Sequence, residues 1–156
     1  MAYIEWLKQD TAKLKIMIFT EGTILKPRSL FLTYNHKSYI PIGTCVKMID
    51  AWHDQGAEIV YCTSRRGKHA ISIAAILTLY GFSGTRLYYR AKGQKYKDIV
   101  EQAQPDVLIE DDCKSIGGRW QMCITYVNPE SRMKIKSIVV NEFKGIDHLP
   151  QALSDL

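Results

Sequence analysis

Between residues 15 and 112, short apolar runs alternate with longer segments that are apolar on one side only. The first run, KIMIF at 15–19, is continuously apolar and precedes the turn-forming Gly22, which is typical of a strand buried on both faces of a sheet. Similar runs are AEIVYCTS at 57–64, TRLYYR at 85–90 and DVLIEDD at 106–112. These runs predict strands.

The segments between the runs predict helices. GTCVKMIDAWHDQG at 43–56 places Val46 and Ile49 on one side, RRGKHAISIAAILTLYGF at 65–82 is apolar on most of its faces, and QKYKDIVEQA at 94–103 is mainly polar. Strands that alternate with helices imply right-handed crossovers and a parallel sheet covered on both sides. The predicted fold class is therefore α/β, a three-layer, Rossmann-like arrangement with a mainly parallel sheet.

The remaining segments lie outside this alternation. Residues 24–41 hold two aromatic-rich pieces, LFLTY and KSYIPI, whose spacing suits a small hairpin or flap. QMCITYV at 121–127 and KSIVV at 136–140 predict one or two further strands, and DHLPQALSDL at 147–156 predicts a closing helix. Residues 1–14 carry apolar positions near helical spacing and predict an N-terminal helix.

Length and composition favour one folded domain over residues 1–156. The chain is 46% hydrophobic and 24% charged, without a low-complexity tract. Between Glu21 and Thr63 there is no room for a large helical cap domain, so the site at the end of the first strand is expected to be open.

Other sequence signals exclude several classes of protein. The four cysteines are scattered without a CxxC pair, so neither a zinc site nor a disulfide framework is predicted. The apolar run that begins at Ala70 is too short and interrupted to cross a bilayer, and the first ten residues lack the order of a secretion signal. We expect a cytoplasmic protein with no membrane association.

Basic residues exceed acidic ones and give a formal net charge of +5. Much of the excess lies in two clusters, which are Arg65, Arg66 and Lys68, and then Arg90, Lys92, Lys95 and Lys97. An anionic ligand would be attracted to them. Tyr88 and Tyr89 stand among the second cluster, a mixture that binders of single-stranded nucleic acid use. Alternate tyrosines in a strand also fill the faces of a sheet, so nucleic acid is not the expected partner.

Polar side chains collect where the predicted strands end. Glu21 and Gly22 follow the first strand, and Thr63 and Ser64 follow the second; Glu110, Asp111 and Asp112 end the fourth, and Lys95 and Lys97 begin the helix before it. In an open parallel sheet the ligand site lies outside the carboxyl ends of the strands. Because neighbouring acids raise one another's pKa, a cation or a basic group is expected beside the three acids.

The motifs FTEGT, VYCTSR, KGQKYKD and VLIEDD, in this order, make the chain resemble the haloacid dehalogenase superfamily over residues 15–118. The resemblance implies that Thr63 holds a phosphoryl group and that Lys95, or alternatively Lys97, offsets its charge. It implies phosphate contacts from Gly22, Thr63, Ser64, Lys95 and Lys97, and a magnesium ion held by Asp111 and Asp112 with Glu110 beside them. Catalytic roles would fall to Glu21, Thr63 and Lys95.

The sequence departs from the family at the first motif. Phe19 stands where the family has its nucleophilic aspartate, and Glu21 stands where the family has its general acid and base. A phenyl ring can neither attack phosphorus nor bind magnesium. The expected function is therefore the binding of a phosphorylated small molecule or macromolecule with weakly held Mg²⁺ and weak or no phosphatase activity.

Two alternatives stay open at this point. Glu21 could activate a water molecule for direct attack on the phosphate, which would make the protein an unusual phosphohydrolase. The fold could also serve as a structural or interaction module, since fold does not fix function. A site without a cap also suits a homo-oligomer in which a neighbouring copy covers it.

Overall fold

The computed structural model describes residues 13–156. The helix predicted over residues 1–14 lies outside this range except for its last two residues. Within the range, no helix is both long and apolar enough to cross a membrane.

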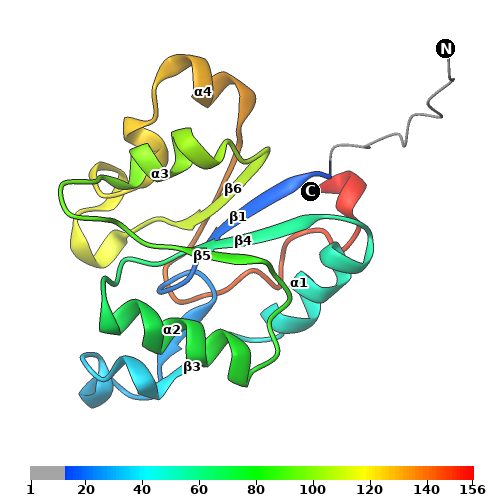
Figure 1. The fold of residues 1–156 in the computed structure, drawn as a ribbon. Helices are drawn as coiled ribbons and strands as arrows, with labels where there is room; N and C mark the ends of the chain where they lie inside the picture. The colour runs from blue at the N-terminus through cyan, green and yellow to red at the C-terminus, as the bar shows by residue number, and fades with distance from the viewer. Residues whose placement is uncertain (1–12) are drawn as a thin grey trace, which may run out of the picture.

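A five-stranded sheet forms the centre of the molecule (Figure 1). Its strands are β1 (Lys15–Phe19), β4 (Glu58–Cys62), β5 (Arg86–Tyr88), β6 (Val107–Asp111) and β7 (Lys136–Val140). They pair in the order β5-β4-β1-β6-β7, and every pairing is parallel. The predicted α/β fold class with a mainly parallel sheet is confirmed.

Alternating side chains of the central strand β1 enter two separate cores. Ile16 and Ile18 belong to one apolar cluster, and Met17 belongs to the other; all three are fully buried. This is the pattern of a strand covered on both faces. The continuous apolar run that predicted the strand is thus explained by helices on both sides of it.

Helices α1 (Cys45–Asp54) and α2 (Lys68–Leu79) cover one face of the sheet, and α3 (Tyr96–Ala103) and α4 (Pro129–Lys134) lie over the other (Figure 1). The fully buried Trp52 of α1 anchors the chain near its C-terminus, because its indole Nε1 donates a hydrogen bond of 2.9 Å to the carbonyl of Pro150.

The expected flap is a two-stranded antiparallel hairpin made of β2 (Leu25–Pro27) and β3 (Tyr39–Pro41). Residues 13–156 form no large cap domain. The LFLTY piece is not a strand, contrary to the expectation: Leu30–Leu32 form a 3₁₀ turn at the flap tip, where Leu30 and Phe31 are exposed and have no strand to pair with.

The sequence predicts one or two further strands at 121–127 and 136–140, and one of them forms, β7, which pairs with β6. Residues 121–127 contain a 3₁₀ helix at Cys123–Tyr126 instead, because the amides of Cys123 and Ile124 donate to the Glu110 carboxylate. The closing helix predicted at 147–156 is reduced to a 3₁₀ turn at Leu153–Asp155, since Pro150 cannot continue a helix.

Two isoleucines of α2 offer a matched test of this packing. Ile73 is fully buried in the core, whereas Ile71, two residues earlier, is 71% exposed. Ile73→Ala should lower the free energy of unfolding by about 2–5 kcal/mol, because it removes buried methyl groups and leaves a cavity. Ile71→Ala should change it by less than about 0.5 kcal/mol. Urea denaturation followed by circular dichroism measures both, and equal effects would contradict the burial of this face.

Candidate functional site

A pocket of about 450 Å³ opens where β1, β4 and β6 end. Its walls come from the strand ends, from the flap residues Thr33 and Tyr39, and from the loops after β5, β6 and β7. From β1 the chain builds the sheet outward in one direction through β4 and β5, and then in the other direction through β6 and β7. The pocket lies at this change of direction, where ligand sites of open α/β sheets are found. The sequence prediction of a site at this edge has its counterpart in this pocket.

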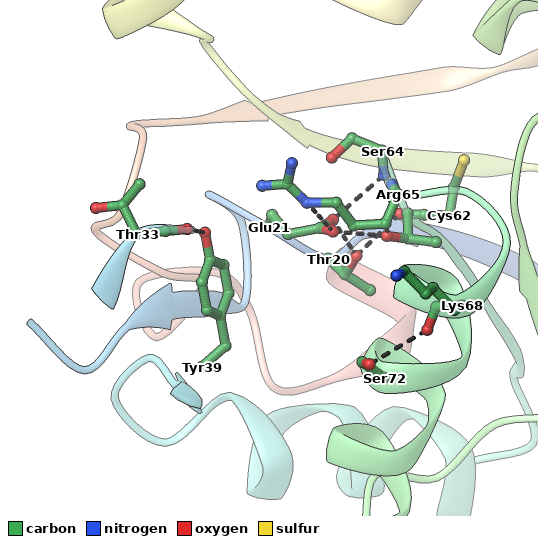
Figure 2. Close-up of polar contacts among 10 residues, drawn as sticks. Thr20, Glu21, Thr33, Tyr39, Cys62, Ser64, Arg65, Lys68 and Ser72 are labelled. Atoms are coloured by element: carbon green, nitrogen blue, oxygen red, sulfur yellow. Dashed lines mark hydrogen bonds and ion pairs between the residues drawn. The ribbon is translucent and has the colours of Figure 1, made fainter. Parts of the chain in front are cut away.

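The carboxylate of Glu21 is the centre of a hydrogen-bond network between the ends of β1 and β4 (Figure 2). Its Oε1 accepts from the Thr63 hydroxyl at 2.6 Å, and its Oε2 accepts from the Thr20 hydroxyl at 2.5 Å. The Ser64 amide lies 3.3 Å from Oε2. Arg65 places its Nε 3.4 Å from Oε1. Both carboxylate oxygens are therefore already engaged by groups of the chain.

Thr63 is fully buried and is held on two sides. It donates to Glu21 and accepts from the Arg65 amide at 3.1 Å. The Thr63 hydroxyl thus already donates and accepts hydrogen bonds within the network. The binding of phosphate by Thr63 and Ser64 stays a prediction. Ser64 does line the pocket.

Gly22 brings the first turn against the end of β6. It has a φ of +84°, and a Cβ at this position would lie 2.8 Å from Oδ1 of Asp111, so only glycine fits without displacing that carboxylate. Its amide donates to the Leu25 carbonyl at 2.9 Å, which engages the donor expected to contact phosphate. The buried Thr23 hydroxyl donates to Oδ1 of Asp111 at 3.0 Å.

Asp111 is nearly buried and has no cationic partner within 4 Å among residues 13–156. Burial raises the pKa of its carboxyl above the usual range, although hydrogen bonds from the Cys113 amide and the Thr23 hydroxyl act in the opposite direction. Asp111 is the acid of the predicted metal set that turns its side chain toward Gly22 and the pocket.

Glu110 has a structural partner of its own. Its two carboxylate oxygens accept hydrogen bonds from the backbone amides of Cys123 and Ile124, at 2.7 and 2.9 Å. The side chain is 2% exposed, and burial raises its pKa to about 7. Glu110 thus fastens the loop after β6 to the sheet.

The carboxylates of the predicted magnesium set have separate hydrogen-bond partners. Asp112 accepts from the amides of Lys114 and Glu142, and Glu142 accepts from the amide and hydroxyl of Ser115. No three His, Cys, Asp or Glu side chains in the described part of the chain are clustered so that they could hold a metal ion by themselves. Mg²⁺ can also bind through one or two carboxylates completed by water and phosphate. A magnesium ion held by Asp111 and Asp112 with Glu110 beside them therefore stays a prediction of the resemblance.

The Phe19 side chain packs against the apolar core and offers no nucleophilic group. Its ring meets that of Tyr96 edge to face, with 5.4 Å between the ring centroids, and both residues border the cluster that contains Met17. Burial raises the pKa of Tyr96 to about 12, so the phenol is neutral at physiological pH. The position that would carry the nucleophile therefore contributes to the core.

The cations of the pocket are Arg65 and Arg90, whereas Lys95 and Lys97 line a neighbouring groove. The Nε atoms of both arginines are buried without a hydrogen-bond partner in the described chain. Arg90 lies over the ring of Tyr96, with its Cζ 4.1 Å from the centroid, and forms no ion pair within 4 Å there. Both arginines belong to the basic clusters seen in the sequence, but nothing in the motifs distinguished them from the lysines.

Glu110 should make stability depend on pH. A carboxyl with a raised pKa binds more protons in the folded than in the unfolded chain. Its contribution to the free energy of unfolding therefore falls as pH rises from about 4.5 to about 7. One pKa unit corresponds to about 1.4 kcal/mol, so the free energy of unfolding should fall by up to roughly 3 kcal/mol. Glu110→Gln should be less stable at pH 5 and should lack this fall.

Urea denaturation at pH 5 and pH 8 measures the difference between the variant and the natural chain. Glu130→Gln is the control, because the Glu130 side chain is 86% exposed and its removal should leave the pH dependence unchanged. A fall of the same size in Glu110→Gln would contradict the assignment.

Comparison with known proteins gives similarity at the level of structure. No protein family matches the sequence, and no curated protein does. A chain of the Pnkp1/Rnl/Hen1 complex superposes with a TM-score of 0.60 at 14% identity, over 90% of this chain and 50% of that one. A second structure, of the Pnkp1/Rnl/Hen1 RNA repair complex, gives a TM-score of 0.54 at 14% identity, with 90% and 47% covered. This chain thus spans about half the length of those chains.

A D,D-heptose 1,7-bisphosphate phosphatase from Burkholderia thailandensis superposes with a TM-score of 0.50 at 10% identity, over 85% of this chain and 94% of that one. At these identities the comparison concerns the fold alone. This chain therefore shares the α/β fold of these structures.

Proposed function

We propose that this chain binds a phosphorylated ligand in the pocket at the ends of β1, β4 and β6 and turns it over weakly or not at all. The observation that carries the proposal is Arg90, which lines the pocket with a buried Nε that has no partner and with no ion pair among residues 13–156. Buried donors are nearly always hydrogen-bonded in native proteins, so such a group calls for a missing acceptor. A phosphate supplies acceptors that match a planar guanidinium.

The charges of the other groups are compatible with an anion. Arg65 is partly neutralised by Glu21, but its guanidinium end extends past that carboxylate toward Thr33 and Tyr39 of the flap (Figure 2). The pKa of the Glu110 carboxyl is raised, and its oxygens accept hydrogen bonds from backbone amides. Arg90 is therefore the cation of the described pocket that has no ion pair, and Asp111 is a carboxylate of the pocket that has no cationic partner.

The weak turnover follows from Phe19 and Glu21. Without a nucleophilic carboxylate the covalent route is closed, and only positioning and electrostatic stabilisation remain. The alternative, in which Glu21 activates water, is disfavoured because each carboxylate oxygen already has two polar neighbours. Oε1 faces the Thr63 hydroxyl and Arg65, and Oε2 faces the Thr20 hydroxyl and the Ser64 amide. A water molecule would have to compete with these groups for the carboxylate. The proposal does not depend on magnesium, because Arg90 supplies the cation that faces the phosphate.

Phosphate binding should depend on Arg90. Arg90→Ala should weaken the binding of inorganic phosphate at least tenfold, because a hydrogen bond to a charged group contributes about 1.5–3 kcal/mol. Arg86→Ala removes the same charge from an exposed position at the start of β5, which does not line the pocket, and should change the affinity less than twofold. Isothermal titration calorimetry measures both. No binding by the natural chain at millimolar phosphate would reject the proposal, as would equal affinities of the two variants.

Phe19→Asp restores the missing nucleophile. The natural chain should hydrolyse p-nitrophenyl phosphate no faster than background, with or without magnesium. Phe19→Asp should gain magnesium-dependent hydrolysis, because the new carboxylate supplies both an attacking oxygen and an added metal ligand beside Asp111. Phe19→Asn, which is similar in size but cannot attack, is the control. Substantial turnover by the natural chain that Glu21→Gln abolishes would instead support water activation by Glu21.

A further inference from the structure

A groove of about 440 Å³ adjoins the pocket and shares Arg90, Tyr96 and Gln121 with it. Its other walls include Lys95 and Lys97 at the start of α3 and two aromatic side chains, Trp120 and Tyr126. A ligand in the pocket can therefore extend into the groove past Arg90.

The aromatic side chains of the groove are exposed, and they belong to a loop that is held by its own hydrogen bonds. Trp120 is 62% exposed and Tyr126 is 54% exposed. The Tyr126 hydroxyl donates to the Trp120 carbonyl at 2.7 Å, and the Thr125 hydroxyl donates to the Arg119 carbonyl at 2.5 Å. These bonds join residues 119–120 to residues 125–126 within the loop after β6. A rigid aromatic surface loses little entropy when a ring stacks on it.

Glu110 fixes the same loop from inside. Its bonds to the amides of Cys123 and Ile124 join the loop to the end of β6, which also carries Asp111. The aromatic surface thus has a set position relative to the pocket. Arg119 stacks over Trp120 at 4.9 Å but is not among the residues that line the groove, so it does not fill the space between Trp120 and Tyr126.

The groove is also positively charged. Arg90 and Lys95 form no ion pair within 4 Å in the described chain, and Lys97 has a partly exposed partner, Asp98, at 3.6 Å. No acidic residue lines the groove. A ligand that fits must therefore combine a planar ring with negative charge, which is how nucleotides meet aromatic and basic surfaces.

We propose that the groove binds the base of a nucleotide whose phosphate occupies the pocket beside Arg90. The inference rests on the proposed function, and it adds the chemical class of the ligand. Stacking on Trp120 or Tyr126 would hold the base, and Lys95 and Lys97 would lie along the sugar and any further phosphate. The nucleotide is either free or the terminal residue of a strand, because both present the same phosphate, sugar and base.

Calorimetric titration with adenosine 5′-monophosphate and with ribose 5-phosphate separates the base from the rest of the ligand. The natural chain should bind the nucleotide at least tenfold more tightly, since stacking on an aromatic side chain contributes on that scale. Trp120→Ala should reduce this preference to less than threefold and leave the affinity for ribose 5-phosphate unchanged within twofold. Trp120→Phe, which keeps a ring, should retain most of the preference.

Fluorescence gives a second readout. With Trp6→Phe introduced in both proteins, the nucleotide should quench the emission of Trp120, and the quenching should be lost in Trp120→Ala, because the remaining Trp52 is fully buried. A 5′-phosphorylated tetranucleotide identifies the source: much tighter binding than the mononucleotide assigns a strand end, and similar binding assigns a free nucleotide.

Several results would overturn the inference. Equal affinities of the natural chain for the nucleotide and for ribose 5-phosphate would remove the base site and leave the phosphate-binding proposal intact. Phosphotyrosine, whose ring is joined directly to the phosphate, should bind less tightly than the nucleotide; equal or tighter binding would also overturn it. If no phosphorylated compound binds, this inference and the proposed function both fail.

Discussion

The bridge from the end of β1 to the end of β4 through the Glu21 carboxylate sets the shape of the pocket. Thr20 and Glu21 follow the central strand, Thr63 follows its neighbour, and one buried carboxylate accepts hydrogen bonds from both sides. On the other side of β1, Gly22 lets the same turn lie against Asp111 at the end of β6. The three strand ends are therefore joined at a single turn, and the flap begins directly after it.

The location of the site could be predicted from the sequence because it depends on local rules. Continuous apolar runs identify buried parallel strands, and strand ends in such a sheet converge on one edge. Side-chain direction is not available from the same patterns. Glu110 and Asp111 are adjacent in the sequence, but one carboxylate binds the amides of Cys123 and Ile124 and the other faces the turn. The three adjacent acids of this motif therefore have different structural roles, which the sequence pattern does not distinguish.

The basic residues show the same limit. The family resemblance points to Lys95 and Lys97, whereas the cationic side chains that line the pocket are Arg65 and Arg90. Which cationic side chains line the pocket depends on the conformation of the loop that contains Arg90 and of the long loop after β6. The sequences of these loops have no periodic pattern from which that conformation could be predicted. The errors at residues 121–127 and 147–156 have a related cause, since tertiary hydrogen bonds and Pro150 override the apolar spacing there.

The edge-to-face contact between Phe19 and Tyr96 has a consequence for stability. The two rings join the end of the central strand to α3. A carboxylate in place of Phe19 would lie against an apolar neighbour, which costs free energy because a buried charge without a partner is poorly solvated. Any substitution that adds a reactive group at the end of β1 would therefore weaken the contact that holds α3 to the sheet.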